Sequence, residues 1–493
     1  MNWVKQRIFL IMLYFWIYKY AGIMEKYNQR RIAHWNKVAE KLRHWRGLGR
    51  YYNKRVSDIY RFNIPENKSV LEVGTGSGKL LSSLDPKRGL GIDISEGMVT
   101  LAREIHPELE FRQMDAVNFQ IDEKFDFVVM SDTINDLYDV QATLENIAHV
   151  LKPDGRLIIN FYNRLWELPL RVAEMLSLAK PNLMQNWLTV DDARNLLNLA
   201  GFETIKGWEE VIFPFSIPLI TPLINKFLVR FWPFKHLAMT YFLVARPKPQ
   251  PTKEKPSVSI IVPTRNEAGN IAAIFSRIPD AFTNPELIFV EGHSTDNTLD
   301  EIRKQIKAHP QVNASLFIQD GKGKGDAVRL GFSKAGGDVL MILDADLTMP
   351  PENLPRFYDA IVNGVGEFIN GVRLVYPMEK DAMRFFNLIG NKFFSVVFTF
   401  LLGQPVKDTL CGTKVLTRKH YQEIARNRSY FGDFDPFGDF DLLFGAAKLN
   451  LKIVDMPIRY TERVYGETNI QRWRHGWLLL RMVTFAALRL KFI

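Results

Sequence analysis

VLEVGTGSGKL, residues 70–80, joins a short apolar run to three glycines at positions 74, 76 and 78. Such a run is typical of a buried strand, and the glycines allow a tight turn and close approach of a ligand to the main chain. The spacing excludes two phosphate-binding signatures. A P-loop needs four residues between its first glycine and Gly-Lys, and a dinucleotide fingerprint needs G-x-G-x-x-G. The remaining pattern, ExGxGxG, predicts a ligand-binding turn after a strand.

Two acidic residues end the strands that follow this turn. Asp93 lies in GLGIDIS, where a carboxylate can accept ribose hydroxyls, and Asp115 lies in FRQMDAVNF. With HVLKPDGRLII further on, these motifs resemble those of class I S-adenosylmethionine-dependent methyltransferases, over residues 30–246. The resemblance implies a Rossmann-like domain that binds S-adenosylmethionine through Glu72, Gly74, Gly76, Gly78, Asp93 and Asp115. The alternative is a domain that kept this fold and serves as a non-catalytic docking module.

The methyl acceptor is less well marked than the cofactor. SDTINDLYD, residues 131–139, lacks the N-P-P-Y of many nucleobase methyltransferases, so no nucleic-acid partner is expected. Asn135, Asp136 and Tyr138 are either acceptor contacts or, for the two polar residues, helix caps. The apolar, proline-broken segment 213–237 is interpreted as a lid over an apolar substrate or a membrane-dipping element, with packing against another domain as the alternative.

LDADL, residues 343–347, places Asp344 and Asp346 one residue apart at the end of the apolar run DVLMI. Two carboxylates at this spacing can bind one hard divalent cation, Mg²⁺ or Mn²⁺, which also binds a nucleotide diphosphate. Three further motifs precede it in the same half of the chain: SVSIIVPTRNEAGN, LIFVEGHSTDNT and GKGKGDA.

In order, these motifs resemble family 2 glycosyltransferases of the GT-A fold, of the dolichyl-phosphate mannose synthase (polyprenyl-phosphate) type. The resemblance implies a nucleotide-sugar donor bound by Pro263, Arg265, Glu267, Glu291, Asp344 and Asp346, with Asp344 and Asp346 also holding the metal. Gly292 and His293 depart from the family pattern, which puts selectivity for the donor base in doubt. Thr348 stands where a glutamine is common.

The same resemblance assigns the acceptor side. Arg373 and Arg384 match residues that hold the phosphate of a polyprenyl acceptor, and Arg463 matches a loop that closes on the donor diphosphate. Asp441 falls at an acid-Leu-Leu motif and is expected to orient the acceptor during inverting transfer. A glycan hydroxyl is the alternative acceptor, although the Q-x-x-R-W motif of cellulose-type enzymes is absent.

Composition fits a two-enzyme chain. The 493 residues exceed one ordinary core, the single Cys411 excludes an internal disulfide, and the net charge of +10 favours an anionic partner. We predict an apolar and basic N-terminal segment 1–29, a methyltransferase domain 30–246, a Pro-rich linker 247–256, a glycosyltransferase domain 257–470 and an amphipathic helix 471–493.

The chain ends are expected to meet a membrane. The apolar run from Ile8 to Tyr18 is too short to span a bilayer and is interpreted as an interfacial anchor, unless translation starts at Met24. The C-terminal segment combines apolar residues with Arg, Lys and Trp, as interfacial helices do. These features predict peripheral attachment to an anionic membrane surface on its cytoplasmic face.

Overall fold

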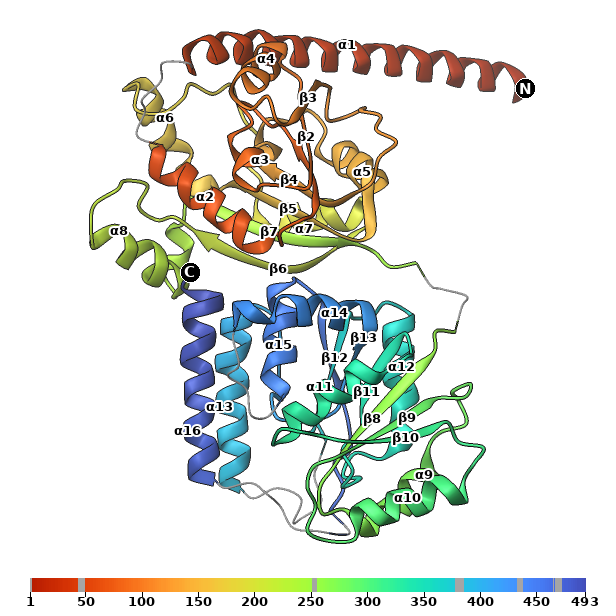
Figure 1. Cartoon of the computed structure of the whole chain (residues 1–493). Helices are drawn as coiled ribbons and strands as arrows, with labels where there is room; N and C mark the ends of the chain where they lie inside the picture. Colours follow the sequence, from red (N-terminus) through yellow and green to blue (C-terminus); the bar gives the residue numbers. More distant parts are fainter. Residues whose placement is uncertain are drawn as a thin grey trace. The chain divides into compact units, whose positions relative to one another are not determined.

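The structure, a computed structural model, describes residues 2–42, 49–250, 255–376, 385–431, 438–463, 465 and 472–493; for 2–21, 385–389 and 472–475 it gives the backbone alone. The chain divides into two compact units, Met1–Lys248 (unit 1) and Pro249–Ile493 (unit 2) (Figure 1). Each unit is built on a seven-stranded mixed sheet with helices. The prediction of two α/β domains is confirmed.

The sheet of unit 1 has the strand order β3-β2-β1-β4-β5-β7-β6. All neighbours are parallel except β7, which runs antiparallel to β5 and β6. Because the chain runs outward from β1 in one direction and returns at β4, the carboxyl ends of β1 and β4 flank a topological switch point. The strands are β1 Ser69–Val73, β2 Arg88–Asp93, β3 Glu110–Gln113, β4 Phe125–Ser131, β5 Leu151–Tyr162, β6 Phe202–Glu210 and β7 Thr240–Pro247.

Helices cover both faces of this sheet, which explains why its strands read as continuous apolar runs. Leu71 and Val73 belong to one buried cluster, with residues of α5 and α7, whereas Val70 belongs to the other, with residues of α2, α3 and α4. The helices of unit 1 are α1 Asn2–Leu42, α2 Arg50–Asn63, α3 Lys79–Ser83, α4 Glu96–Ile105, α5 Val140–Val150, α6 Glu167–Met175, α7 Val190–Leu199 and the short α8 Ile220–Pro222.

The sheet of unit 2 has the order β10-β9-β8-β11-β13-β12-β14, with β13 antiparallel to both of its neighbours. The carboxyl ends of β8 and β11 flank the switch point here. The strands are β8 Val258–Thr264, β9 Glu286–Glu291, β10 Ala314–Ile318, β11 Val339–Ile342, β12 Phe368–Val372, β13 Lys414–Thr417 and β14 Ile453–Pro457.

Two buried clusters again sandwich the sheet of unit 2. Ile260 and Val262 face the cluster that includes residues of α9, α10 and α12, and Ile261 faces the cluster that includes residues of α11 and α13 to α16. None of the helices in the described part of the chain is long and apolar enough to cross a bilayer. The helices are α9 Ala268–Arg277, α10 Thr298–Ala308, α11 Lys324–Lys334, α12 Leu354–Val362, α13 Phe385–Leu402, α14 Arg418–Arg426, α15 Asp439–Lys448 and α16 Arg472–Ala486.

Candidate active sites

The glycine-rich turn of unit 1 follows β1 at the switch point. Gly74, Gly76 and Gly78 have φ of 75°, 53° and 73°, in the left-handed region that favours glycine. A Cβ on Gly74 would lie 2.4 Å from side-chain atoms of Thr133, and one on Gly78 would lie 2.6 Å from the Phe111 ring, whereas nothing lies within 4 Å of a Cβ on Gly76. Gly74 and Gly78 are therefore constrained by both conformation and space, and Gly76 by conformation.

Glu72 holds this turn from the inside. Its buried carboxylate accepts hydrogen bonds from the Thr75 hydroxyl at 2.7 Å and the Leu81 amide at 3.2 Å. Burial raises the pKa of Glu72 to about 8, although both hydrogen bonds lower it. Its contacts are those of a residue that shapes the cofactor loop.

Asp93, the last residue of β2, and Asp115, just after β3, are partly exposed. Asp93 accepts hydrogen bonds from the amides of Gly76 and Ser95, both at 2.9 Å, so it ties the glycine turn to the start of α4. Asp115 accepts from the Val117 amide at 3.0 Å and from the Asn28 side chain of α1 at 2.6 Å. The structure thus brings the predicted cofactor residues to one edge of the sheet, where α1 also lies.

The C-terminal half of α1 contacts this edge at several further points. Asn36 accepts hydrogen bonds from the Ser95 hydroxyl at 2.6 Å and the Gly97 amide at 2.9 Å. Trp35 donates to Asp136 at 2.7 Å, and Arg31 forms an ion pair with Asp136 at 3.2 Å. Asp136 is therefore engaged by α1, a contact that its sequence neighbourhood did not indicate.

The acidic site of unit 2 is centred on Asp344 and Asp346, which follow β11. Lys324 of α11 donates to Asp344 at 2.5 Å, and Arg463 forms an ion pair with Asp346 at 2.5 Å. Although burial raises the pKa of Asp344, the Lys324 ammonium lowers it below its ordinary value, and Asp344 in turn raises the pKa of Lys324. Lys324 is a site residue that sequence reasoning missed, and Thr348, which donates to Asp346 at 2.8 Å, completes this group.

Glu267 extends the site toward β8. It lies 3.5 Å from Arg463, which therefore bridges Glu267 and Asp346, and it accepts a hydrogen bond from Asn270 at 2.7 Å. Burial raises the pKa of Glu267 to about 7, although Arg463 opposes this shift. Three carboxylates and two cations thus meet at the β8–β11 switch point.

The rest of the predicted donor turn surrounds this centre. Pro263 is half-buried and Arg265 is exposed. The buried Glu291 at the end of β9 accepts a hydrogen bond from the Ser294 amide at 2.6 Å, and the Asn266 amide donates to the Ser294 hydroxyl at 3.0 Å. Glu291 therefore supports the loop that holds the predicted nucleotide-binding turn.

A glycine and a buried lysine lie next to the acidic site. A Cβ on Gly412 would lie 2.0 Å from the Asp344 carboxylate and 2.1 Å from the Lys324 ammonium, so another residue would displace this pair. Lys414 is fully buried and pairs with Asp439 of α15 at 3.3 Å. Asp439 joins this group through that pair, and Asp441 pairs with Arg428 at 2.8 Å, so the predicted role of Asp441 stays a prediction.

Two arginines were predicted to hold the acceptor phosphate. Arg373 is buried and donates two side-chain hydrogen bonds to Asp408, at 2.7 and 2.8 Å. Its charge also lowers the pKa of Asp344, so it contributes positive potential to the site. Arg384 lies outside the described residues, and its predicted role stays a prediction.

The oxygen donors of this site fit a divalent cation that completes its shell elsewhere. The described residues contain no group of three or more His, Cys, Asp or Glu side chains arranged to hold a metal ion. Mg²⁺ is commonly bound by one or two carboxylates together with water and substrate phosphate oxygens, which suits Asp344 and Asp346. Asp344 and Asp346 would hold such a cation, and their carboxylates are paired here with Lys324 and Arg463.

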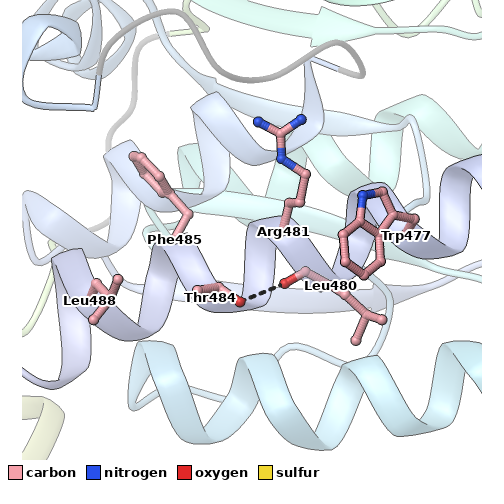
Figure 2. A pocket seen from close by; sticks show the side chains of 6 residues that line it. All are labelled: Trp477, Leu480, Arg481, Thr484, Phe485 and Leu488. Carbon is pink, nitrogen blue, oxygen red and sulfur yellow. Dashed lines mark hydrogen bonds between the residues drawn. The ribbon is translucent and has the colours of Figure 1, made fainter.

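Unit 2 also has an exposed apolar surface on α13 and α16, which pack against each other (Figure 1). Val396 is 70% exposed on α13, and Trp477 is 67% exposed on α16. Figure 2 shows Trp477, Arg481 and Phe485 projecting from α16. With Leu480 and Thr484 of the same helix, and Leu488 just beyond it, they line an open groove of about 400 Å³. An aromatic and aliphatic surface that carries arginine is typical of interfacial helices.

Comparison with known proteins identifies both units. Residues 259–425 match the family described as glycosyl transferase family 2, and residues 43–206 match the family described as a methyltransferase domain. The dolichyl-phosphate hexose transferase of Haloferax volcanii is 30% identical over 224 residues, which cover 44% of this chain and 89% of that protein.

Two further proteins resemble part of the chain. The dolichol-phosphate mannosyltransferase of Pyrococcus furiosus is 30% identical over 219 residues, which cover 43% of this chain and 59% of that protein. This chain therefore spans less than two thirds of the Pyrococcus protein. The structure of a mannosyltransferase from Pyrobaculum calidifontis, solved with GDP-Man and Mn²⁺, is 20% identical with a TM-score of 0.34, covering 46% of this chain and 60% of that one. Through unit 2 the chain belongs to glycosyl transferase family 2, and its unit 1 is a methyltransferase domain.

Proposed function

We propose that unit 2 transfers a sugar from a nucleoside-diphosphate-sugar donor to a polyprenyl phosphate, with inversion at the anomeric carbon. We further propose that unit 1 methylates an acceptor with S-adenosylmethionine. The observation that carries the first part is the group of paired charges around Asp344 and Asp346 at the β8–β11 switch point. The relatives whose names include dolichyl phosphate support the choice of acceptor.

The charges of this group suit two phosphate-bearing substrates. A lipid phosphate is already ionised near neutral pH, so its oxygen can attack the anomeric carbon without strong help from a general base. The site must instead offset the repulsion between acceptor phosphate and donor diphosphate. Lys324, Arg463 and Arg373 bring positive charge to the carboxylates, and a divalent cation bound at Asp344 and Asp346 would neutralise charge on the leaving diphosphate.

In this proposal the positive charge of Arg373 acts on the site at a distance, while its side chain is hydrogen-bonded to Asp408. Arg384 is proposed as the residue that grips the acceptor phosphate, and Asp441 as an orienting acid through its pairing with Arg428. The exposed apolar surface of α13 and α16 supports peripheral attachment of unit 2 to a membrane, at the cytoplasmic face, where a polyprenyl chain would be offered.

The deciding experiment is transfer by the purified full chain. A short polyprenyl phosphate, Mg²⁺ or Mn²⁺ and a panel of GDP- and UDP-sugars are incubated with it, and lipid products are read by mass spectrometry. We expect a metal-dependent glycosyl phospholipid that Asp346→Ala fails to form and Asp359→Ala, at an exposed acid of α12, still forms. Nucleotide binding without any lipid product would favour a glycan hydroxyl as acceptor.

The activity of unit 1 has its own test. Titration calorimetry with S-adenosylmethionine should give binding that is lost when Asp93, which is bonded to the glycine turn, is changed to Ala. A chain that does not bind S-adenosylmethionine would instead support the docking-module alternative for unit 1.

A further inference from the structure

A second network of titratable side chains lies in unit 1, at the residue that follows β4. Asp132 has φ of 56°, an uncommon conformation for a residue other than glycine. Its carboxylate accepts hydrogen bonds from the Tyr52 hydroxyl of α2 at 2.8 Å and from the Asn160 amide of β5 at 2.6 Å. Burial and the Asp132 charge raise the pKa of the nearby Tyr162 phenol. Two neutral donors thus hold one carboxylate in a fixed orientation.

This network lies beside the predicted cofactor turn. Thr133, the next residue, approaches Gly74 so closely that its hydroxyl lies 3.5 Å from the Gly74 carbonyl oxygen. The predicted cofactor residues lie at or after the carboxyl ends of β1, β2 and β3, whereas Asp132 and Asn160 belong to the β4 and β5 side of the switch point. A cofactor on one side and an acceptor on the other would therefore meet at Asp132.

Two side chains of this network are partly accessible to solvent, and the pKa values of its titratable groups differ from the ordinary ones. Asp132 and Tyr162 are partly exposed. Burial raises the pKa of Asp132 to about 6, and the surrounding phenols of Tyr52, Tyr60 and Tyr162 have pKa values raised well above 10 by burial and by Asp132. At neutral pH the carboxylate is ionised and the phenols are protonated, so Asp132 is the group in this network that can take up a proton.

Exposed apolar side chains begin a few residues after Tyr162. Leu168, Val172 and Met175 of α6 are 71%, 55% and 83% exposed at helical spacing, and the segment 213–237 exposes Leu219, Leu223 and Trp232. The two stretches are joined, because Trp166 donates to the Leu237 carbonyl at 2.9 Å. We call these six residues the α6 apolar face. Lys180, just beyond α6, carries a charge that lowers the pKa of Asp132, so a cation lies within electrostatic reach of the network.

We propose that Asp132 is the general base of unit 1 and that the methyl acceptor is a hydroxyl on the headgroup of a phosphate-bearing amphiphile, with its phosphate at Lys180 and its apolar chain on the α6 apolar face. The inference rests on the proposed methyltransferase activity of unit 1 and names its substrate class. A glycosyl phosphoprenol, the product proposed for unit 2, has all three features.

The step balances with S-adenosylmethionine as the methyl donor. The acceptor oxygen forms a bond to the methyl carbon while the carbon–sulfur bond breaks, and sulfur keeps that electron pair. The hydroxyl proton passes to Asp132, whose partners Tyr52 and Asn160 keep the carboxylate aimed during the transfer. Placement of the acceptor oxygen, the methyl carbon and the sulfur in line supplies the remaining rate acceleration.

The test supplies the full chain with synthetic mannosyl, glucosyl and N-acetylglucosaminyl phosphoprenols, so that it does not depend on unit 2. Methyl transfer from radiolabelled S-adenosylmethionine to the extracted lipid is measured for wild type, Asp132→Asn and Asp85→Asn. Asp85 is a matched control, because it is an exposed aspartate of unit 1 that also has positive φ, 48°. We expect Asp132→Asn to lower the rate by roughly 10²–10⁴-fold, with unchanged affinity for S-adenosylmethionine.

The pH profile separates a base from a merely structural residue. Since Asp132 must be ionised, the wild-type rate should rise through a pH of about 6 and then level off, and this rise should vanish in Asp132→Asn. Tyr52, Tyr60 and Tyr162 face Asp132 and stay protonated over this range, so they should not produce such a rise. Lys180 also acts on Asp132, and burial lowers the pKa of Lys180.

Lipid affinity without S-adenosylmethionine tests the α6 apolar face independently of activity. Met175→Lys should weaken binding of the phosphoprenol by about ten-fold, whereas Leu199→Lys, at an exposed leucine of α7, should not.

Three results would overturn the inference: full activity of Asp132→Asn, no methylation of any lipid in the panel although S-adenosylmethionine binds, or equal lipid affinity of Met175→Lys and wild type. Failure to bind S-adenosylmethionine would overturn the methyltransferase function itself, and the inference with it.

Discussion

The two units use the same edge of similar sheets but surround their carboxylates with opposite kinds of partner. In unit 1, Glu72 and Asp132 are held by hydroxyls and amides, and burial raises their pKa values. In unit 2, Asp344 is held by the Lys324 ammonium, and its pKa is lowered. A carboxylate with neutral partners is suited to exchange a proton, and one with cationic partners is suited to exchange one cation for another.

One buried carboxylate of unit 1 breaks this contrast and gives the largest expected effect. Glu210 of β6 forms ion pairs with Arg55 and Arg230, and although burial raises its pKa, the two arginines bring it below the ordinary value. Glu210→Gln would leave two buried guanidinium groups underpaired and should cost unit 1 about 3–5 kcal/mol of stability. Calorimetric unfolding of the full chain measures it, since S-adenosylmethionine should shift the transition of unit 1.

Glu209→Gln is the matched control for this change, because Glu209 lies 3.9 Å from Lys235 in a partly exposed pair and should contribute less than about 1 kcal/mol. Equal effects of the two substitutions would mean that the buried triad does not stabilise unit 1 more than a surface pair does.

The contact between Gly412 and the Asp344–Lys324 pair gives the next effect. Gly412→Ala would push a methyl group into this pair, and a displacement of the order of 1 Å can cost about 10²-fold in rate. We expect that loss in glycosyl transfer with little change in the melting temperature. Gly336→Ala is the control, because its added Cβ would meet nothing closer than 3.8 Å. Normal transfer by Gly412→Ala would show that the pair tolerates displacement.

The smallest effect should come from Glu267, a carboxylate of the acidic site in unit 2 whose pKa burial raises to about 7. It must lose a proton to add its charge to a cation site, so the affinity for Mn²⁺ and nucleotide sugar should fall as the pH drops through 7. Between pH 8 and 6 a ten-fold decrease, roughly, is expected from one linked proton. Arg463, Asp344, Asp346 and Asn270 face this group.

Glu267→Gln should flatten that dependence, whereas Glu301→Gln, on α10 and paired with Lys304, should keep it. A pH dependence that survives in Glu267→Gln would assign the proton to another group of the cluster.

Local pattern was enough to predict both folds. Apolar runs such as residues 70–73 and 339–342 are buried on both faces of a sheet, so their composition marks them as strands. Glycine spacing and the Asp344–Asp346 pair then marked the ends of those strands.

What the sequence could not predict are contacts set by tertiary packing. Lys324 precedes its partner Asp344 by 20 residues, and GKGKGDA does not reveal which lysine faces the site. The stretch 131–139 did not single out Asp132, because its partners Tyr52 and Asn160 come from other elements. In α15 the sequence motif pointed to Asp441 and did not reveal that Asp439, two residues earlier, pairs with the buried Lys414.

The glycine turn of unit 1 limits which substitutions homologous sequences can carry at its three glycine positions. At positions 74 and 78 a side chain meets both an unfavourable φ and a neighbouring Thr133 or Phe111, so compensation would require two or more simultaneous changes. At position 76 the space is open and the φ of 53° is one that Asn and Asp tolerate. Natural variation in this turn should therefore be concentrated at its middle glycine.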